Sequence, residues 1–215
     1  AIVPVAMQAA PEEVDLYAQA RLFIATVAAV KPVAERECHA IAPGIDCDFR
    51  ILVDDRPGMP ANAFQTVDDQ GRPVIAFTLA LIAEARNADE LAFVMGHEAA
   101  HHILAHIPRS QQTAVIGGTL SGVLAAALGG DPTAIQTAQE LGAAVGARSY
   151  SKEYELEADE LGTVLTWQAG FDPERGAAFF GRIPDPGDRF MGTHPPNAAR
   201  IAVVRQTLAR LRGGP

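Results

Sequence analysis

The stretch VMGHEAAHHILAH, residues 94–106, contains four of the six histidines of the 215-residue chain together with one glutamate. His97, Glu98 and His101 form the pattern HExxH, and residues four apart on a helix lie on the same face. Two imidazoles can then converge on one ion, and neutral imidazole suits Zn²⁺. Apolar residues on both sides of the motif indicate a buried helix, where a histidine–glutamate cluster needs partners that a metal supplies. The sequence therefore predicts a helix that holds zinc.

The other polar residues of this helix separate into two groups. Glu98 follows the first candidate ligand, where a carboxylate can take a proton from metal-activated water and pass it to a leaving group. We therefore expect Glu98 to act as general base and then as general acid. His102 and His106 lie off the metal-facing side, because one residue turns a helix by about 100° and His106 is five residues beyond His101. Both are expected to be structural or surface histidines.

A catalytic zinc needs a third protein ligand, and the acidic segment YSKEYELEADELG, residues 150–162, offers several. The candidates are Glu153, Glu155, Glu157 and Asp159. Glu155 and Asp159 are four residues apart on a predicted helix, so one could bind zinc while the other accepts an N–H from a ligand imidazole. A solvated acidic face would suit Glu153, Glu157 and Glu160. Spacing alone does not choose among the glutamates.

The remaining pattern predicts one domain, residues 1–215, that is α+β and mainly helical. Residues 1–45 are expected to form N-terminal helices, residues 46–78 a small antiparallel sheet beside the histidine helix, and residues 79–215 the helical catalytic part. The sheet prediction rests on three short runs of β-type composition, DFRILVDD, NAFQTV and PVIAF. The last two flank the hairpin turn DDQGR.

Prolines and acidic residues indicate the helix boundaries. Pro11 is expected to begin the first helix and Pro32 a second, short one. Asp89 is expected to begin the histidine helix, and Pro108 to end it. Further helices are expected over residues 131–146, 151–168 and 195–211.

The segment TAVIGGTLSGVLAAALGG, residues 113–130, contains no charged residue and has Gly118 and Gly122 at a small-xxx-small spacing. That composition is typical of a membrane-facing hairpin or span. The segment is nevertheless short for a span and has neither basic flanks nor an aromatic belt. Packing against the domain, or a flexible loop, is the favoured interpretation.

Charge and cysteines limit the partners and the compartment. The net charge of −9 and the pI near 5.1, without a basic cluster, exclude nucleic acid as a partner. Pro43 and Gly44 can turn the chain between Cys38 and Cys47, which makes a disulfide geometrically easy, although two buried thiols are the alternative. A disulfide would indicate an oxidising compartment such as a bacterial periplasm. The chain begins without Met and without a signal peptide, as expected of a mature product.

Three segments, DELAFVMGHEAAHHILAH, SKEYELEAD and THPPNAARI, together resemble the HtpX-like and CAAX prenyl protease-like family of zinc endopeptidases, over about residues 60–201. In that family the glutamate of an E-x-x-A-D element is the third zinc ligand. The resemblance therefore implies Glu155 as that ligand and Asp159 as the acid that orients a ligand histidine. It also implies a zincin-like metalloprotease domain with one Zn²⁺ per chain.

The resemblance also implies roles outside the histidine helix. Asn62, Ala63 and Phe64 would line the substrate cleft, where an extended peptide could add as a further strand. His194, in the His-Pro element of the family, would stabilise the oxyanion or cover the zinc in a resting state. The alternative for His194 is a loop histidine that holds a turn. Arg200 would anchor this loop to an acidic residue.

Integral-membrane members of the family carry clear spans, so a soluble or peripheral bacterial periplasmic type is expected here. We predict a zinc-dependent endopeptidase that hydrolyses peptide bonds through a metal-activated water, in quality control or processing of envelope proteins. Its substrates would be polypeptides, including unfolded or envelope proteins, and membrane association is compatible with this prediction but not required. The alternative is a chaperone-like or scaffold protein in which zinc stabilises the fold and its fourth position is closed, for instance by His194.

Overall fold

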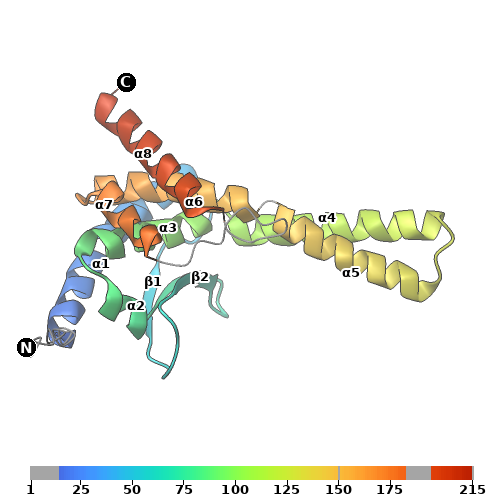
Figure 1. Ribbon diagram of the computed structural model, residues 1–215, viewed down its shortest axis with the longest axis horizontal. Coiled ribbons are helices and arrows are strands. Elements are labelled where there is room, and N and C mark those ends of the chain that lie inside the picture. Colours follow the sequence, from blue (N-terminus) through green and yellow to red (C-terminus); the bar gives the residue numbers. More distant parts are fainter. Residues whose placement is uncertain (1–14, 150, 183–194, 215) are drawn as a thin grey trace, which may run out of the picture.

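The structure, a computed structural model, describes residues 15–149, 151–182 and 195–214 (Figure 1). It is mainly helical with a small sheet, as the sequence predicted. A compact body holds the sheet and most of the helices, and two long helices project from this body as a hairpin (Figure 1). In chain order the elements are α1 (Leu16–Ile41), β1 (Arg50–Asp54), β2 (Ala63–Val67), β3 (Pro73–Thr78), α2 (Leu79–Glu84), α3 (Ala88–Ile103), α4 (His106–Ala127), α5 (Pro132–Ser149), α6 (Ser151–Gln168), α7 (Pro173–Ala177), the 3₁₀ turn η1 (Ala178–Gly181) and α8 (Asn197–Gly213).

Helix α3 carries the HExxH motif through the middle of the body. It begins after Asn87, whose side-chain oxygen accepts a hydrogen bond from the backbone N–H of Glu90 at 3.1 Å. This contact satisfies one of the open N–H groups of the first turn, so the helix begins one residue before the expected Asp89. Its side chains are mostly buried against α1, α6 and the sheet, in agreement with the apolar residues around the motif.

Two glycines allow α3 and α6 to lie unusually close together. A Cβ atom on Gly162 would lie 2.9 Å from the backbone nitrogen of His97, and one on Gly96 would lie 2.9 Å from the carbonyl oxygen of Gly162. Any side chain at either position would push the two backbones apart. The glycine contact therefore brings the acidic segment of α6 beside the histidines of α3.

The sheet has the strand order β1-β3-β2. β2 and β3 pair antiparallel across the predicted turn at residues 68–72, but β1 pairs parallel with β3, with Ile51 opposite Ile75. The prediction of an antiparallel sheet is therefore correct for one pair and wrong for the other, because the sheet is mixed. All residues of β3 are buried, so this strand takes the central place, and β1 adds to the edge that the hairpin leaves open.

Two prolines do not act as expected. Pro32 lies inside the continuous helix α1, where burial of Val30, Val33 and Ala34 compensates for the hydrogen bond that proline cannot donate. Pro108 lies in the first turn of α4, where no intrahelical N–H is required. The break before it is made by Ala105, which has left-handed backbone angles (φ 55°, ψ 39°).

Other helix predictions agree with the structure to within a few residues. α6 spans residues 151–168 as expected, whereas α5 and α8 begin and end slightly later than predicted. α1 begins at Leu16 after the capping residue Asp15, and Pro11 lies outside the described residues. Cys38 and Cys47 form the predicted disulfide, with a Cα–Cα distance of 5.8 Å, which ties the end of α1 to the chain entering β1.

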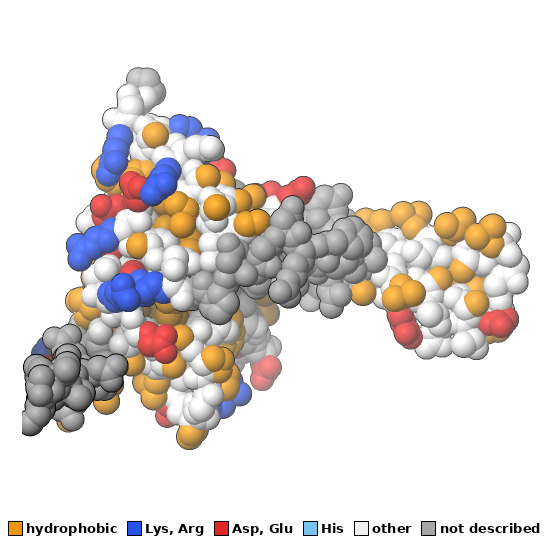
Figure 2. Space-filling model, in the orientation of Figure 1, with side chains coloured by type: hydrophobic (Ala, Val, Ile, Leu, Met, Phe, Trp, Pro, Cys, Tyr) orange, Lys and Arg blue, Asp and Glu red, His pale blue; other side chains and the backbone are white. Residues whose placement is uncertain are grey.

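The uncharged segment at residues 113–130 is mostly helical and forms the outer part of α4. It packs against α5 and not against the body, so neither a loop nor packing on the domain describes it. Its exposed side carries apolar residues along the projecting hairpin (Figure 2). Within the described part of the chain, no helix combines the length and hydropathy that crossing a membrane requires.

Candidate metal centre

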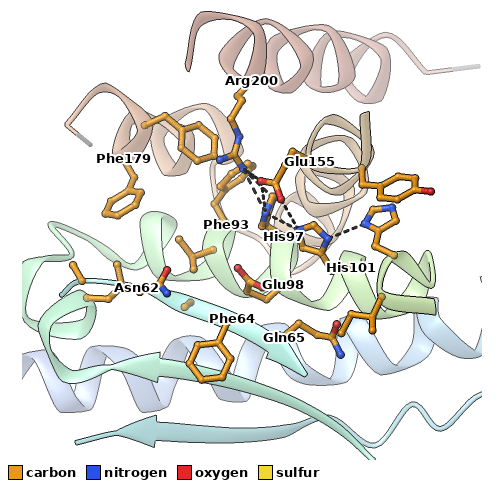
Figure 3. Close-up of a pocket in the computed structure, with 18 of the residues that line it drawn as sticks. Asn62, Phe64, Gln65, Phe93, His97, Glu98, His101, Glu155, Phe179 and Arg200 are labelled. Carbon is orange, nitrogen blue, oxygen red and sulfur yellow. Dashed lines mark hydrogen bonds and ion pairs between the residues drawn. The ribbon is translucent and has the colours of Figure 1, made fainter. Parts of the chain in front are cut away.

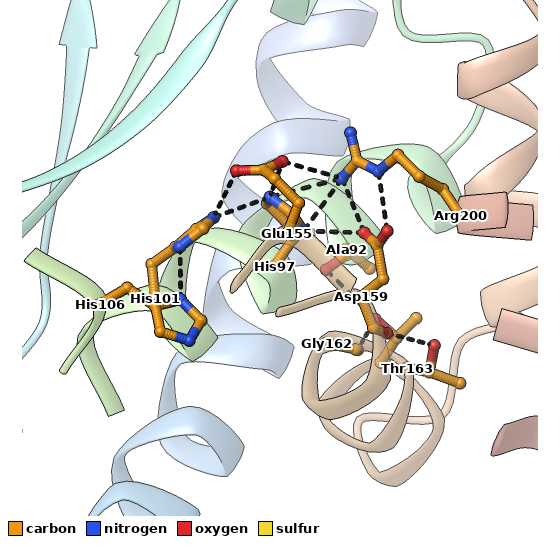
Figure 4. A network of polar contacts seen from close by, with 10 residues as sticks. Ala92, His97, His101, His106, Glu155, Asp159, Gly162, Thr163 and Arg200 are labelled. Atoms are coloured by element: carbon orange, nitrogen blue, oxygen red, sulfur yellow. Dashed lines mark hydrogen bonds and ion pairs between the residues drawn. The ribbon is translucent and has the colours of Figure 1, made fainter. Parts of the chain in front are cut away.

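Three side chains from α3 and α6 converge on one point (Figure 4). The Nε2 atoms of His97 and His101 are 3.0 Å apart. The carboxylate oxygens of Glu155 lie 3.6 Å from Nε2 of His97 and 3.4 Å from Nε2 of His101. One potential ligand atom from each of the three residues lies within 4.8 Å of the others.

This donor set fits a tetrahedral divalent metal. Ligand atoms about 2.0–2.1 Å from a tetrahedral zinc lie about 3.3 Å from one another, which is close to the separations seen here. Two imidazole nitrogens and one carboxylate also leave one position free for water or substrate, as in catalytic zinc sites. The residues described therefore suit zinc in both number and chemistry.

The ligand candidate His97 is held from behind by a buried ion pair. Its Nδ1 lies 2.9 Å from a carboxylate oxygen of Asp159, which is 0% exposed. Arg200 of α8 donates two hydrogen bonds of 2.7 Å to the same carboxylate, and its guanidinium lies 3.7 Å from the ring centroid of Phe180. The structure thus places Asp159 against His97, where its orienting role stays a prediction, and Arg200 binds an acidic residue as expected.

These contacts shift the pKa values of both groups. Burial raises the pKa of Asp159, but hydrogen bonds from Arg200 and His97 outweigh burial and hold it below its usual range. Burial lowers the pKa of His97, but hydrogen bonds to Asp159 and Glu155 outweigh burial and raise it to about 10. A metal at Nε2 of His97 and a proton on that nitrogen exclude each other, so metal binding at this site competes with protonation.

His101 has a different partner, which the sequence interpretation missed. Its Nδ1 lies 2.8 Å from Nδ1 of His106, and Nε2 of His106 lies 3.1 Å from a carboxylate oxygen of Glu157. Glu157 also accepts a hydrogen bond of 2.7 Å from Arg109. Burial lowers the pKa of His106 to about 4, so this imidazole is neutral near pH 7.

The helix geometry used for the sequence prediction does not apply to His106, because α3 has already ended. The left-handed residue Ala105 turns the chain, so His106 begins α4 and its ring returns over α3. Glu157 remains partly exposed, as a solvated acidic face would be, but its pairing with His106 and Arg109 was not foreseen. The signal in the sequence that could have indicated this contact is a histidine that follows HExxH at a possible helix break.

Glu153 and Glu160 are exposed, as expected of a solvated face. His102 has a structural role, because its Nε2 lies 2.7 Å from the carbonyl oxygen of Asp46. His194 lies outside the described residues.

The three candidate ligands open into a cleft of about 840 Å³ (Figure 3). Glu98 lines this cleft beside the ligands, on the side that faces β2 (Figure 3). Asn62, Ala63 and Phe64 also line it, and contact of these residues with substrate stays a prediction. In the described sheet β2 is an edge strand, so its outer side is not paired with another strand.

Aromatic and apolar side chains form much of the cleft wall. Phe93 and Phe179 lie at the end near Arg200 and Asn62 (Figure 3). Gln65 lies at the other end, toward His101 (Figure 3), and Ser110 and Gln111 of α4 also contribute to the lining. The cleft wall thus mixes aromatic and polar side chains, and the candidate metal ligands lie between its two ends.

Comparisons with known proteins agree with this geometry. The sequence model of the family described as Peptidase family M48 matches residues 30–208. A putative beta-barrel assembly-enhancing protease of Vibrio cholerae is 32% identical over 120 residues, which is 52% of this chain and 24% of that protein. The beta-barrel assembly-enhancing protease of Escherichia coli K12 is 29% identical over 146 residues, which is 62% of this chain and 30% of that protein.

The chain spans about a quarter to a third of the length of these relatives. The family match, in contrast, includes α3, α6 and most of α8, which together supply the candidate ligands and their buried partners. The chain therefore belongs to peptidase family M48, and its domain is of the metalloendopeptidase class.

Proposed function

We propose that this chain is a zinc-dependent endopeptidase with the metal held by His97, His101 and Glu155. One observation carries the proposal: two Nε2 atoms and a carboxylate converge within 4.8 Å, beside Glu98, in a cleft bordered by an edge strand. A purely structural zinc site is usually closed by four protein ligands. Three ligands that face a cleft suit hydrolysis better.

The roles of the residues follow from their positions. A zinc ion bound here would act as a Lewis acid and lower the pKa of a water in the cleft. Glu98 is the general base that accepts a proton from the attacking water and then, as general acid, passes it to the leaving amine. Asp159 accepts the Nδ1–H of His97, which leaves Nε2 of that ring free of a proton.

The substrate would bind as an extended peptide along β2. The outer edge of this strand offers backbone N–H and C=O groups, and a peptide can pair with them as an added strand. Asn62, Ala63 and Phe64 lie where such a peptide would pass Glu98. This mode of binding recognises backbone and therefore suits polypeptides with exposed, extended segments.

The proposed setting is the processing or quality control of envelope proteins outside the bacterial cytoplasm. Two observations support it: the Cys38–Cys47 disulfide, which persists in oxidising compartments, and relatives whose names describe enhancement of beta-barrel assembly. Unfolded outer-membrane proteins are accordingly the first substrates to test.

The test compares the wild-type chain with Glu98→Gln on casein and on an unfolded outer-membrane protein, with zinc content measured for both. We expect cleavage by the wild type and a loss of about 10²- to 10⁴-fold in the variant, because Gln cannot accept the proton. Both proteins should bind zinc, because Glu98 is not a ligand. If neither protein cleaves while both bind zinc, the chaperone-like or scaffold alternative replaces the endopeptidase.

A further inference from the structure

We propose that His106 is a positioning residue for the zinc site, which fixes the tautomer and the orientation of His101 through a chain of hydrogen bonds that ends at Glu157. This inference rests on the proposed function, because it takes His101 as a zinc ligand. It assigns a role to a histidine outside the HExxH pattern and to an arginine and a glutamate that pair beside it.

The first step concerns protons. Nε2 of His101 faces His97 and Glu155, so this nitrogen must be free of a proton to bind a metal. The single proton of the neutral ring is then on Nδ1, which lies 2.8 Å from Nδ1 of His106. His101 is therefore the donor in this contact, and His106 accepts.

The second step fixes His106 itself. Since its Nδ1 accepts, its own proton is on Nε2, and this N–H points at the Glu157 carboxylate 3.1 Å away. Each donor in the chain therefore meets an acceptor: His101 donates to His106, which donates to Glu157. Partners of this kind behind a ligand histidine set its tautomer and ring orientation and increase its basicity.

The third step is the rigidity of His106, which is only 4% exposed. Its ring stacks on Tyr154 with a centroid distance of 4.7 Å and an interplanar angle of 11°. Arg109 lies over the same tyrosine at 4.3 Å and also donates to Glu157. The left-handed turn at Ala105 sets the start of α4 so that this ring meets His101.

The two histidines of the motif are thus supported in different ways. His97 contacts the carboxylate of Asp159 directly, whereas His101 reaches the carboxylate of Glu157 through an intervening imidazole. Because His106 and Arg109 belong to α4, the second arrangement links the base of the projecting hairpin to the metal site.

The test measures zinc affinity of the purified chain by competition with a chromogenic chelator. In His106→Phe the ring can still stack on Tyr154, but both nitrogens are lost. We expect its zinc affinity to fall by about 10- to 100-fold, the usual effect of losing a partner behind a ligand. His106→Asn retains a side-chain oxygen able to accept from His101 and should recover part of the loss.

The matched control is His102→Phe, which makes the same change at the histidine that directly follows His101 and whose ring meets Phe49 and not the site. Its zinc affinity should equal that of the wild type. Cobalt substituted for zinc adds a spectroscopic readout, because the visible bands should change in His106→Phe and stay unchanged in His102→Phe. Circular dichroism of the metal-free variants checks the fold, and His106→Leu serves if phenylalanine cannot be accommodated.

The outcomes separate this inference from the proposed function. If His97→Ala binds zinc as tightly as the wild type, the assigned ligands are wrong, and the inference fails with them. If His97→Ala loses zinc but folded His106→Phe or His106→Leu keeps wild-type affinity and cobalt spectrum, only the inference fails. It also fails if His106→Asn is as weak as His106→Phe, since the hydrogen bond would then have no part in the effect.

Discussion

Two helix pairs in this molecule pack closely through glycines, and the two contacts have different consequences. α3 meets α6 through Gly96 and Gly162, and α4 meets α5 through Gly118, Gly122 and Gly142. In the first pair the contact is buried in the body and surrounded by paired polar groups. In the second pair the outer surface of α4 is apolar and exposed, with Leu120 at 66% and Leu124 at 61%.

The difference shows what burial adds to a close helix contact. Glycine lets two backbones approach in either setting, but in the body the contact lies beside three polar side chains that are largely buried, His97, Asp159 and Arg200. Groups buried in this way must satisfy one another, so their geometry becomes fixed. The hairpin of α4 and α5 places no comparable constraint on its residues. Its outer part, residues 113–135 (the arm), holds no network of paired ionisable side chains among the described residues.

The largest expected effect is that of metal removal, which should weaken the body and leave the arm unchanged. A ligand present at about 1,000 times its Kd stabilises the folded state by about 4 kcal/mol. Chelation should therefore lower the Tm, abolish proteolysis and speed amide exchange in α3 and α6, whereas exchange near residues 120–135 stays the same. Added zinc should reverse all three effects. Equal changes in both helix pairs would show that the arm depends on the metal site.

Asp159→Ala is expected to destabilise the protein by about 3 kcal/mol or more, because it removes the main partner of a buried guanidinium. It also leaves Nδ1 of His97 without its acceptor, so zinc affinity should fall as well. Urea unfolding and chelator competition measure the two effects. Asp159→Asn is the control: its amide oxygen can still accept from His97 and from one N–H of Arg200, although the second Arg200 bond is lost, so it should lose less. Stability equal to the wild type in the Ala variant would mean that the pair contributes nothing to folding.

Matched glycine substitutions compare the two helix contacts directly. Gly162→Ala places a methyl group 2.9 Å from backbone atoms of α3, which cannot move alone, so we expect a loss of about 1–3 kcal/mol together with weaker zinc binding. The three atoms nearest to a methyl group at Gly122 all belong to the flexible side chain of Gln139, so Gly122→Ala should change the free energy of unfolding by less than about 0.5 kcal/mol. Equal losses of unfolding free energy in the two variants would mean that the flexibility of the Gln139 side chain does not lower the cost of the added methyl group.

The smallest expected effect belongs to the apolar side of the arm. Leu120→Ser combined with Leu124→Ser changes two exposed side chains, so the free energy of unfolding should stay within about 0.5 kcal/mol per substitution. Chemical denaturation of the isolated chain checks this value. A loss of 2 kcal/mol or more would show that this surface is covered in solution.

The successful parts of the sequence interpretation rest on local geometry. HExxH places His97 and His101 on one side of a helix wherever that helix lies, and the nine-residue separation of Cys38 and Cys47 allowed a disulfide without knowledge of the fold. The predictions were wrong where a contact with another part of the chain decided the local structure. β1 was assigned the wrong direction because strand composition does not name a partner, and Pro32 failed to end α1 because core packing outweighed one missing hydrogen bond.

The sequence by itself determined the two candidate metal ligands on one helix face, the position of Glu98 between them and the acidic helix predicted to supply a third ligand. The tertiary structure decided which acid reaches the histidines: the Gly96–Gly162 contact brings Glu155 and Asp159 to α3 and leaves Glu153 and Glu160 in solvent. It also decided that Arg200 and His106 join the site. Arg200 lies 41 residues beyond Asp159 on another helix, and His106 depends on the single left-handed residue Ala105, and helix periodicity predicts neither contact.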